Sequence, residues 1–161
     1  MRAYIVRPPL VYGPGVRANF LRLMNWVNAG IPLPFAGIQN RRSIVSVWNL
    51  CDLIGRVLQE DTHVIETPLL VSDGTDVSTP QLIEEIARSM RRPSRLFALP
   101  QGVIRLMGAA LGRREEILRL IGSFAADINE TRRSLNWSPP VPWSEGISRT
   151  VSWYVTRRDS G

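Results

Sequence analysis

The residues that decide the fold of this chain are Tyr4-Ile5-Val6-Arg7-Pro8-Pro9-Leu10-Val11, which lead into Gly13-Pro14-Gly15. Apolar residues on both sides of the proline pair predict a buried strand. Because proline has no N–H to donate to a sheet, this strand must loosen around Pro8 and Pro9. The glycines on either side of Pro14 predict a turn. The sequence therefore predicts a strand with a built-in break, followed by a tight turn.

Strands and helices alternate along the rest of the chain. The sequence predicts seven helices, most of them from apolar residues at helical spacing, at about 19–28, 49–58, 80–90, 101–111, 113–121, 127–135 and 144–154, and short strands are expected at 43–47, 68–71 and 95–99. Asn19 and Asn49 are expected to cap the first two helices, and Asp127 with Glu130 the sixth. This alternation predicts an α/β fold. Only the strands at 4–11 and 68–72 have the pattern of full burial, and a parallel sheet needs further neighbours, so the chain resembles part of a larger sheet protein.

The charge of the chain is carried by one type of basic residue. All 20 basic residues are arginine, and the formal net charge is +6. This charge raises nucleic-acid binding as a hypothesis. The five arginine pairs fall in separate segments without interleaved aromatic residues, which favours a solvated basic surface. The absence of lysine excludes Schiff-base chemistry and a tyrosine base assisted by lysine.

The remaining composition describes an ordinary globular chain, with 44% hydrophobic and 21% charged residues. The single cysteine, Cys51, lies in an apolar helical pattern and is expected to be a buried structural thiol. The chain has one cysteine and one histidine, His63, which are too few for a typical zinc site. No metal ligand is therefore assigned. No apolar run is long enough to span a bilayer, and Arg7 interrupts any signal-peptide pattern, so we expect a soluble cytoplasmic protein without a membrane partner.

Two groups of residues could bind a ligand. The residues Gly13, Gly15 and Ala18 formally match the G-x-G-x-x-A dinucleotide fingerprint, but no acidic residue follows about 20 positions later, so a structural turn is favoured. Asn19 at a helix N-terminus and Arg42 before a strand are suited to phosphate. The segment 33–35, framed by prolines, could form a wall against a flat ring. The alternatives stay open: Asn19 as a cap, Arg42 as a surface charge and Phe35 as core.

Four motifs occur in the order in which a known family carries them. They are Arg7-Pro8-Pro9-Leu10-Val11-Tyr12-Gly13-Pro14-Gly15, Arg41-Arg42-Ser43-Ile44-Val45-Ser46-Val47-Trp48-Asn49-Leu50, Leu70-Val71-Ser72-Asp73-Gly74 with Ser78-Thr79-Pro80, and Leu135-Asn136-Trp137-Ser138-Pro139. Together they resemble the C-terminal half of the NAD-dependent epimerase/dehydratase family, the extended short-chain dehydrogenases of the UDP-glucose 4-epimerase type. The resemblance covers essentially the whole chain. The family's Gly-rich NAD loop and Tyr-x-x-x-Lys pair have no counterpart in it.

The resemblance implies roles for particular residues. Asn19 and Arg42 match the family's diphosphate contacts, and Arg119 is the nearest candidate for a further diphosphate arginine. Leu33 and Phe35 match the strand that flanks the uracil ring. The loop that backs the nicotinamide ring of NAD corresponds to Pro8, Pro9 and Val11. Two departures leave the sugar undefined: Leu10 stands where many members have an asparagine that contacts the substrate, and Ala125 stands where the galactose epimerase has a tyrosine near the sugar.

The resemblance implies the C-terminal part of an extended Rossmann-type epimerase, with few parallel strands and a small, mostly helical substrate lobe. The Rossmann-derived strands are expected near 3–12 and 68–73, and the lobe near 16–42 and 93–161. The expected function is binding of a UDP-sugar within an NAD-dependent epimerase or dehydratase of polysaccharide biosynthesis, with no catalytic residue in this chain. The alternatives are part of a 4-keto-sugar reductase, a non-catalytic module completed by a partner chain, and a basic nucleic-acid-binding domain. Association as a homodimer or with a missing N-terminal half is expected through the first strand.

Overall fold

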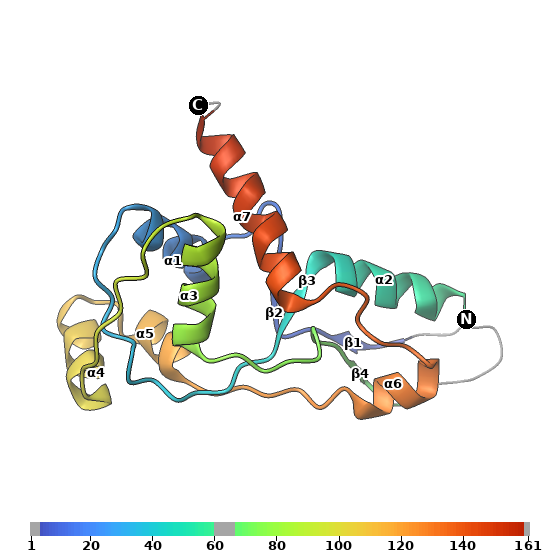
Figure 1. Cartoon of the computed structure of the whole chain (residues 1–161). Helices are drawn as coiled ribbons and strands as arrows, with labels where there is room; N and C mark the ends of the chain where they lie inside the picture. The colour runs from blue at the N-terminus through green and yellow to red at the C-terminus, as the bar shows by residue number, and fades with distance from the viewer. Residues whose placement is uncertain (1–3, 60–66, 160–161) are drawn as a thin grey trace.

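Two pairs of parallel strands occur in the computed structural model, which describes residues 4–59 and 67–159 (Figure 1). Strand β1 (Val6–Arg7) pairs with β4 (Leu69–Leu70), and β2 (Leu10–Tyr12) pairs with β3 (Ile44–Ser46). The predicted first strand is therefore divided at Pro8 and Pro9, and its two parts have different partners. The strand predicted at 95–99 is wrong, because only isolated bridges form there, between Leu96 and Leu33 and between Ala98 and Phe35. His63 lies outside the described residues.

Seven helices surround these strands in the described part of the chain. They are α1 (Ala18–Asn28), α2 (Val47–Leu58), α3 (Thr79–Ser89), α4 (Gln101–Ala110), α5 (Arg114–Ile121), α6 (Asn129–Leu135) and α7 (Trp143–Asp159). Figure 1 shows α4 and α5 at one end of the molecule and β1, β4, α2 and α6 at the other. Each predicted helix is present. No described helix combines the length and apolarity of a membrane span, and no described group of acidic, histidine and cysteine side chains is arranged to hold a metal.

Three of the predicted helix caps are wrong. The N-cap of α1 is Arg17, without a side-chain hydrogen bond, and Asn19 lies inside the helix. The cap of α2 is Ser46, whose hydroxyl accepts from the backbone N–H of Asn49. Helix α6 has Ile128 at its N-cap, although Asp127 still accepts from the N–H that opens the helix. The amide side chains of Asn19 and Asn49 instead make tertiary hydrogen bonds, which a local pattern does not reveal.

The strand pair β2–β3 separates two apolar clusters. Side chains on a strand alternate between its faces. Leu10, Tyr12 and Ile44 accordingly pack in the first cluster, with α1, α3 and α7, while Val11 and Val45 pack in the second. The second cluster also holds Leu53, Val57, Leu69, Val71, Leu135 and Trp137. The segment that ends α6 therefore packs beside the β1–β4 pair.

A buried carboxylate connects the two strand pairs. Asp73 follows β4 and accepts hydrogen bonds from the Tyr12 hydroxyl at 2.6 Å, the Ser46 N–H at 2.8 Å and the Asn49 side-chain amide at 2.7 Å. Burial raises the pKa of Asp73 above its usual value, although these hydrogen bonds oppose the rise. Burial and the neighbouring Asp73 also raise the pKa of Tyr12. The Tyr12 hydroxyl lies against α7, where a Cβ on Gly146 would be 2.5 Å from its oxygen.

The prediction that Cys51 is buried is wrong, because its side chain is exposed. The buried stripe of α2 is narrow and consists of Asn49, Leu53 and Val57. These residues recur every four positions, and Cys51 lies on the other side of the helix. The apolar pattern of α2 is wider than the face that the fold covers.

Candidate functional site

A cavity of about 450 Å³ opens between α1, α3, α5, strand β2 and the segment that leads into β3. Most of its lining is apolar, and its polar side chains are Asn19, Arg42, Arg119 and Ser123. No acidic side chain from the described part of the chain lines it. The full lining is Leu10, Ala18, Asn19, Phe20, Leu23, Arg42, Leu82, Leu118, Arg119, Leu120, Gly122, Ser123 and Phe124. An apolar hollow with a few basic groups is suited to an organic anion.

The backbone around Arg42 is fixed on both sides. Arg42 exchanges two hydrogen bonds with Val77, of 3.0 and 2.9 Å, and the segment also pairs with Phe124. In extended backbone, neighbouring side chains point to opposite sides. Arg41 and Ser43 both hydrogen-bond to Asp76 on one side. Arg42 lies between them and points the other way, into the cavity.

The Arg42 guanidinium is a half-buried charge without a partner among the described residues. Its side chain is half-buried, and burial lowers the pKa of Arg42 from its usual value. Arginine nevertheless stays protonated in proteins, so the group carries a positive charge. No hydrogen bond or ion pair joins this side chain to any residue in 4–59 or 67–159. Its planar set of N–H donors is therefore available to an anion in the cavity.

Two further predicted residues lie beside Arg42 in this cavity. Asn19 is in the first turn of α1, and its side chain donates to the backbone oxygen of Glu116 at 3.4 Å. The first N–H groups of a helix have no intrahelical acceptor, so the start of α1 offers donors to a ligand. Arg119, in the last turn of α5, is exposed. The structure thus brings Asn19, Arg42 and Arg119 together from three separate segments.

The other predicted residues lie elsewhere. Leu33 and Phe35 are buried in the first apolar cluster and do not line the cavity. Pro8 is exposed, and Pro9 and Val11 are half-buried, at the break between β1 and β2. The apolar lining residues of α1, α3 and α5 were not predicted, because an apolar residue on an amphipathic helix has the same pattern whether it faces core or cavity.

The fingerprint-like turn before α1 is shaped by packing. Gly13 has φ of 154°, and a Cβ there would lie 2.6 Å from the Val47 side chain. The glycine is therefore required where the turn crosses the start of α2. This contact accounts for Gly13 without a phosphate.

A buried amide fixes one wall of the cavity. The Asn40 side chain donates to the backbone oxygens of Leu120 at 3.0 Å and Gly122 at 2.9 Å. Its oxygen accepts from the backbone N–H of Thr79 at 2.8 Å, at the start of α3. The Thr79 hydroxyl also donates to Leu120. Asn40 therefore ties the end of α5, which carries Arg119, to α3.

The change Asn40→Ala is expected to lower the free energy of unfolding by about 2 kcal/mol, because buried backbone groups lose their partners. Chemical denaturation followed by circular dichroism measures this. The neighbouring Gln39 is exposed, so Gln39→Ala is the control and should change stability by less than about 0.5 kcal/mol. Equal effects of the two substitutions would contradict the role of Asn40.

The chain is similar in sequence to part of a known enzyme. It is 40% identical over 156 residues to a protein named UDP-glucose 4-epimerase from Vibrio cholerae, and the match covers 96% of this chain and 47% of that protein. No family model matches the chain. The chain spans about half the length of the relatives that it matches, and it corresponds to the C-terminal half of the Vibrio protein. The predicted resemblance is confirmed.

Solved structures support the predicted fold. UDP-glucuronic acid 4-epimerase from Bacillus cereus, in complex with NAD, matches with a TM-score of 0.72 and 17% identity over 98% of this chain and 45% of that one. The Bordetella bronchiseptica enzyme WbmG, in complex with NAD and UDP, matches with a TM-score of 0.64 and 15% identity over 94% of this chain and 42% of that one. The chain therefore has the fold of the C-terminal portion of extended Rossmann-type epimerases. NAD, the predicted cofactor of the parent family, is bound in both of these neighbours.

Proposed function

We propose that the cavity binds the diphosphate of a nucleotide sugar, with Arg42 as its central contact. The observation that carries the proposal is the half-buried Arg42 guanidinium, which points into the cavity and has no partner among the described residues. The start of α1 at Asn19 and the exposed Arg119 add donors around the same space. The Bordetella neighbour binds UDP, which supports a uridine diphosphate as the ligand.

For the base, we propose an indirect role of Leu33 and Phe35. Both side chains are buried, and Leu33 exchanges backbone hydrogen bonds of 2.8 and 3.0 Å with the segment 95–97. These contacts hold the proline-framed segment 33–35 in place. Leu33 and Phe35 would thus support a wall beside the uracil ring rather than bury the ring themselves.

The parent activity is proposed as NAD-dependent chemistry at C4 of a UDP-sugar, either 4-epimerisation or net reduction of a 4-keto sugar. NAD supplies hydride acceptance and return in such enzymes. The exposed Pro8 and the half-buried Pro9 and Val11 fit one wall of a nicotinamide site, because two proline rings present carbon rather than N–H groups. We propose that the 161 residues alone do not transfer hydride, since they contain no lysine for a Tyr-x-x-x-Lys pair.

A second chain, or an N-terminal segment with the Gly-rich loop, would complete the enzyme beside β1. Ile5, just before β1, is 58% exposed, which supports a partner along this strand. A homodimer through the same edge is the alternative, and we propose a cytoplasmic location for either assembly. Size-exclusion chromatography with light scattering tests the homodimer, and co-purification with a co-expressed N-terminal half tests the two-chain enzyme.

The test of the ligand site is calorimetric titration of the chain with UDP. We expect Arg42→Ala to weaken UDP binding about 10- to 100-fold, because charge-assisted hydrogen bonds are lost. Arg41→Ala is the matched control, since Arg41 is the neighbouring residue and its side chain pairs with Asp76 outside the cavity. Absence of UDP binding by the unmodified chain, or equal weakening by both substitutions, would contradict the proposal. A salt-sensitive affinity for DNA that exceeds the affinity for UDP would favour the nucleic-acid alternative.

A further inference from the structure

Helix α4 carries an apolar stripe that faces solvent. Val103, Leu106, Met107 and Ala110 recur at the i, i+3, i+4, i+7 spacing that usually marks the buried face of a helix. All four are exposed, Leu106 to 72%, and Leu111, just beyond the helix, is 71% exposed. Most surface apolar residues occur singly, so a stripe of this kind indicates an interaction surface.

The opposite side of α4 is the one that packs against the protein. Ile104 and Gly108 are its buried residues, and a Cβ on Gly108 would lie 2.8 Å from the Ile117 side chain of α5. Helix α4 is thus held on α5 through a narrow, close contact. The solvent-facing stripe remains uncovered within residues 4–59 and 67–159.

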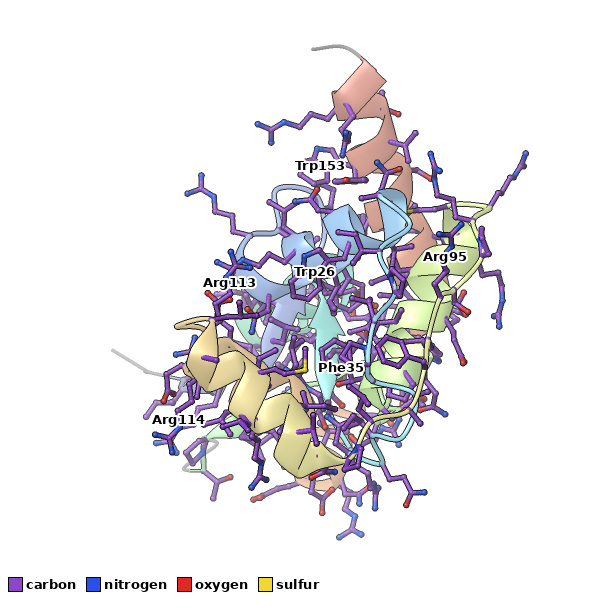
Figure 2. All side chains as sticks on the ribbon, turned by 90° about the vertical axis from the view of Figure 1, so that its left-hand side faces the viewer. Trp26, Phe35, Arg95, Arg113, Arg114 and Trp153 are labelled. Carbon is purple, nitrogen blue, oxygen red and sulfur yellow. The ribbon has the colours of Figure 1, made fainter. Side chains whose placement is uncertain are left out.

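Exposed arginines lie on α4 and at the start of α5, which follows it. The segment 93–124 contains five arginines and two glutamates, a net charge of +5 − 2 = +3. Arg105, Arg113 and Arg114 are exposed, and none makes an ion pair with a described residue. Of the two glutamates, Glu116 is already paired with Arg22. Figure 2 looks onto this end of the molecule, with α4 toward the viewer and Arg113 and Arg114 beside it.

We propose that α4 docks on an anionic lipid surface, with its apolar stripe in the headgroup boundary and the arginines at the phosphates. Amphipathic helices bind membranes through buried apolar area together with attraction to anionic lipids, and arginine stems can lie along the apolar region while their heads stay in water. A spanning segment is not involved, since α4 is about 15 Å long. The contact departs from the expectation that the chain has no membrane partner, which rested on the absence of a spanning run.

Charge and position disfavour the other occupants of this face. A second copy of the chain paired through the same stripe would bring two sets of Arg105, Arg113 and Arg114 together. The partner proposed beside β1 would lie at the opposite end of the molecule from α4 (Figure 1). The membrane contact does not depend on the proposed nucleotide site.

The experiment is co-sedimentation of the chain with vesicles of phosphatidylcholine alone or mixed with phosphatidylglycerol. We expect binding only to the mixed vesicles, weakened about tenfold by Leu106→Ser and about fivefold by each of Arg113→Gln and Arg114→Gln. The matched control is Leu58→Ser, since Leu58 is 78% exposed on α2, at the other end of the molecule from α4. Each variant replaces an exposed side chain, and an unchanged denaturation midpoint verifies its fold.

Three results would overturn the proposal. The first is absence of sedimentation with the mixed vesicles. The second is equal loss of binding for Leu106→Ser and Leu58→Ser. The third is a dimer in solution that Leu106→Ser dissociates without any effect on vesicles, which would assign the stripe to a second copy.

Discussion

Replacing Gly146 with alanine is expected to lower the free energy of unfolding by about 3 kcal/mol. A Cβ at this position would lie 2.5 Å from the Tyr12 hydroxyl oxygen and 3.2 Å from the Ser46 Cβ. The Tyr12 ring is buried and stacks on Phe20, with ring centroids 5.4 Å apart, so it has little space to move. Relief of the clash therefore requires either loss of the Tyr12–Asp73 hydrogen bond or a shift of α7.

Gly55→Ala is the matched control for this change. Gly55 lies within α2, and a Cβ there would have no neighbour within 4 Å. Alanine is favoured over glycine inside a helix, so this variant should gain up to about 1 kcal/mol. Chemical denaturation followed by circular dichroism measures both variants. If Gly146→Ala also gained stability, the close packing of α7 on Tyr12 would be refuted.

The change Asp73→Ala is also expected to cost about 3 kcal/mol of unfolding free energy. The carboxylate accepts hydrogen bonds from Tyr12, Ser46 and Asn49, and all three donors are buried. Tyr12 and Asn49 keep second partners in the carbonyls of Trp143 and Val141, while the Ser46 N–H loses its acceptor.

Asp76→Ala is the control for Asp73→Ala, since Asp76 lies three residues later, pairs with the exposed Arg41 and accepts one hydrogen bond from the Ser43 hydroxyl. A surface ion pair contributes about 0–1 kcal/mol and one hydrogen bond about 1 kcal/mol, so the cost should be about 1–2 kcal/mol, smaller than that of Asp73→Ala. Thermal and chemical denaturation of the two variants gives the comparison. A cost for Asp76→Ala equal to that for Asp73→Ala would contradict the joining role of Asp73.

Most of the fold could be predicted from local patterns. Six of the seven described helices carry apolar residues at helical spacing, α6 was predicted from Asp127 and Glu130, and the proline pair divides the first strand. The errors come from tertiary contacts. Asn49 is a good capping residue, but its side chain bonds to Asp73 and to the backbone of Val141. The segment 95–99 has the composition of a strand and finds only single bridges to the segment 33–35.

The candidate site was less accessible from sequence. Asn19 was identified from its position at the start of a predicted helix, and Arg42 from its position before a predicted strand. The resemblance added Arg119. Leu33 and Phe35 lie in the core. Sequence could not distinguish this from a ligand wall, because apolar residues next to prolines have the same pattern in both. Asn40 gave no signal at all, since its role depends on carbonyls 80 and 82 residues away.

The placement of β2 and β3 between two apolar clusters has a consequence for how these strands find their alignment. Leu10 pairs with Ile44, Val11 with Val45 and Tyr12 with Ser46. A slip by one residue would send every side chain of β2 to the opposite face. Tyr12 would then leave Asp73 and Phe20, and Val11 would leave the second cluster. The correct alignment of a three-residue strand is thus selected by the side chains on both of its faces, and the few hydrogen bonds of the ladder need not distinguish it.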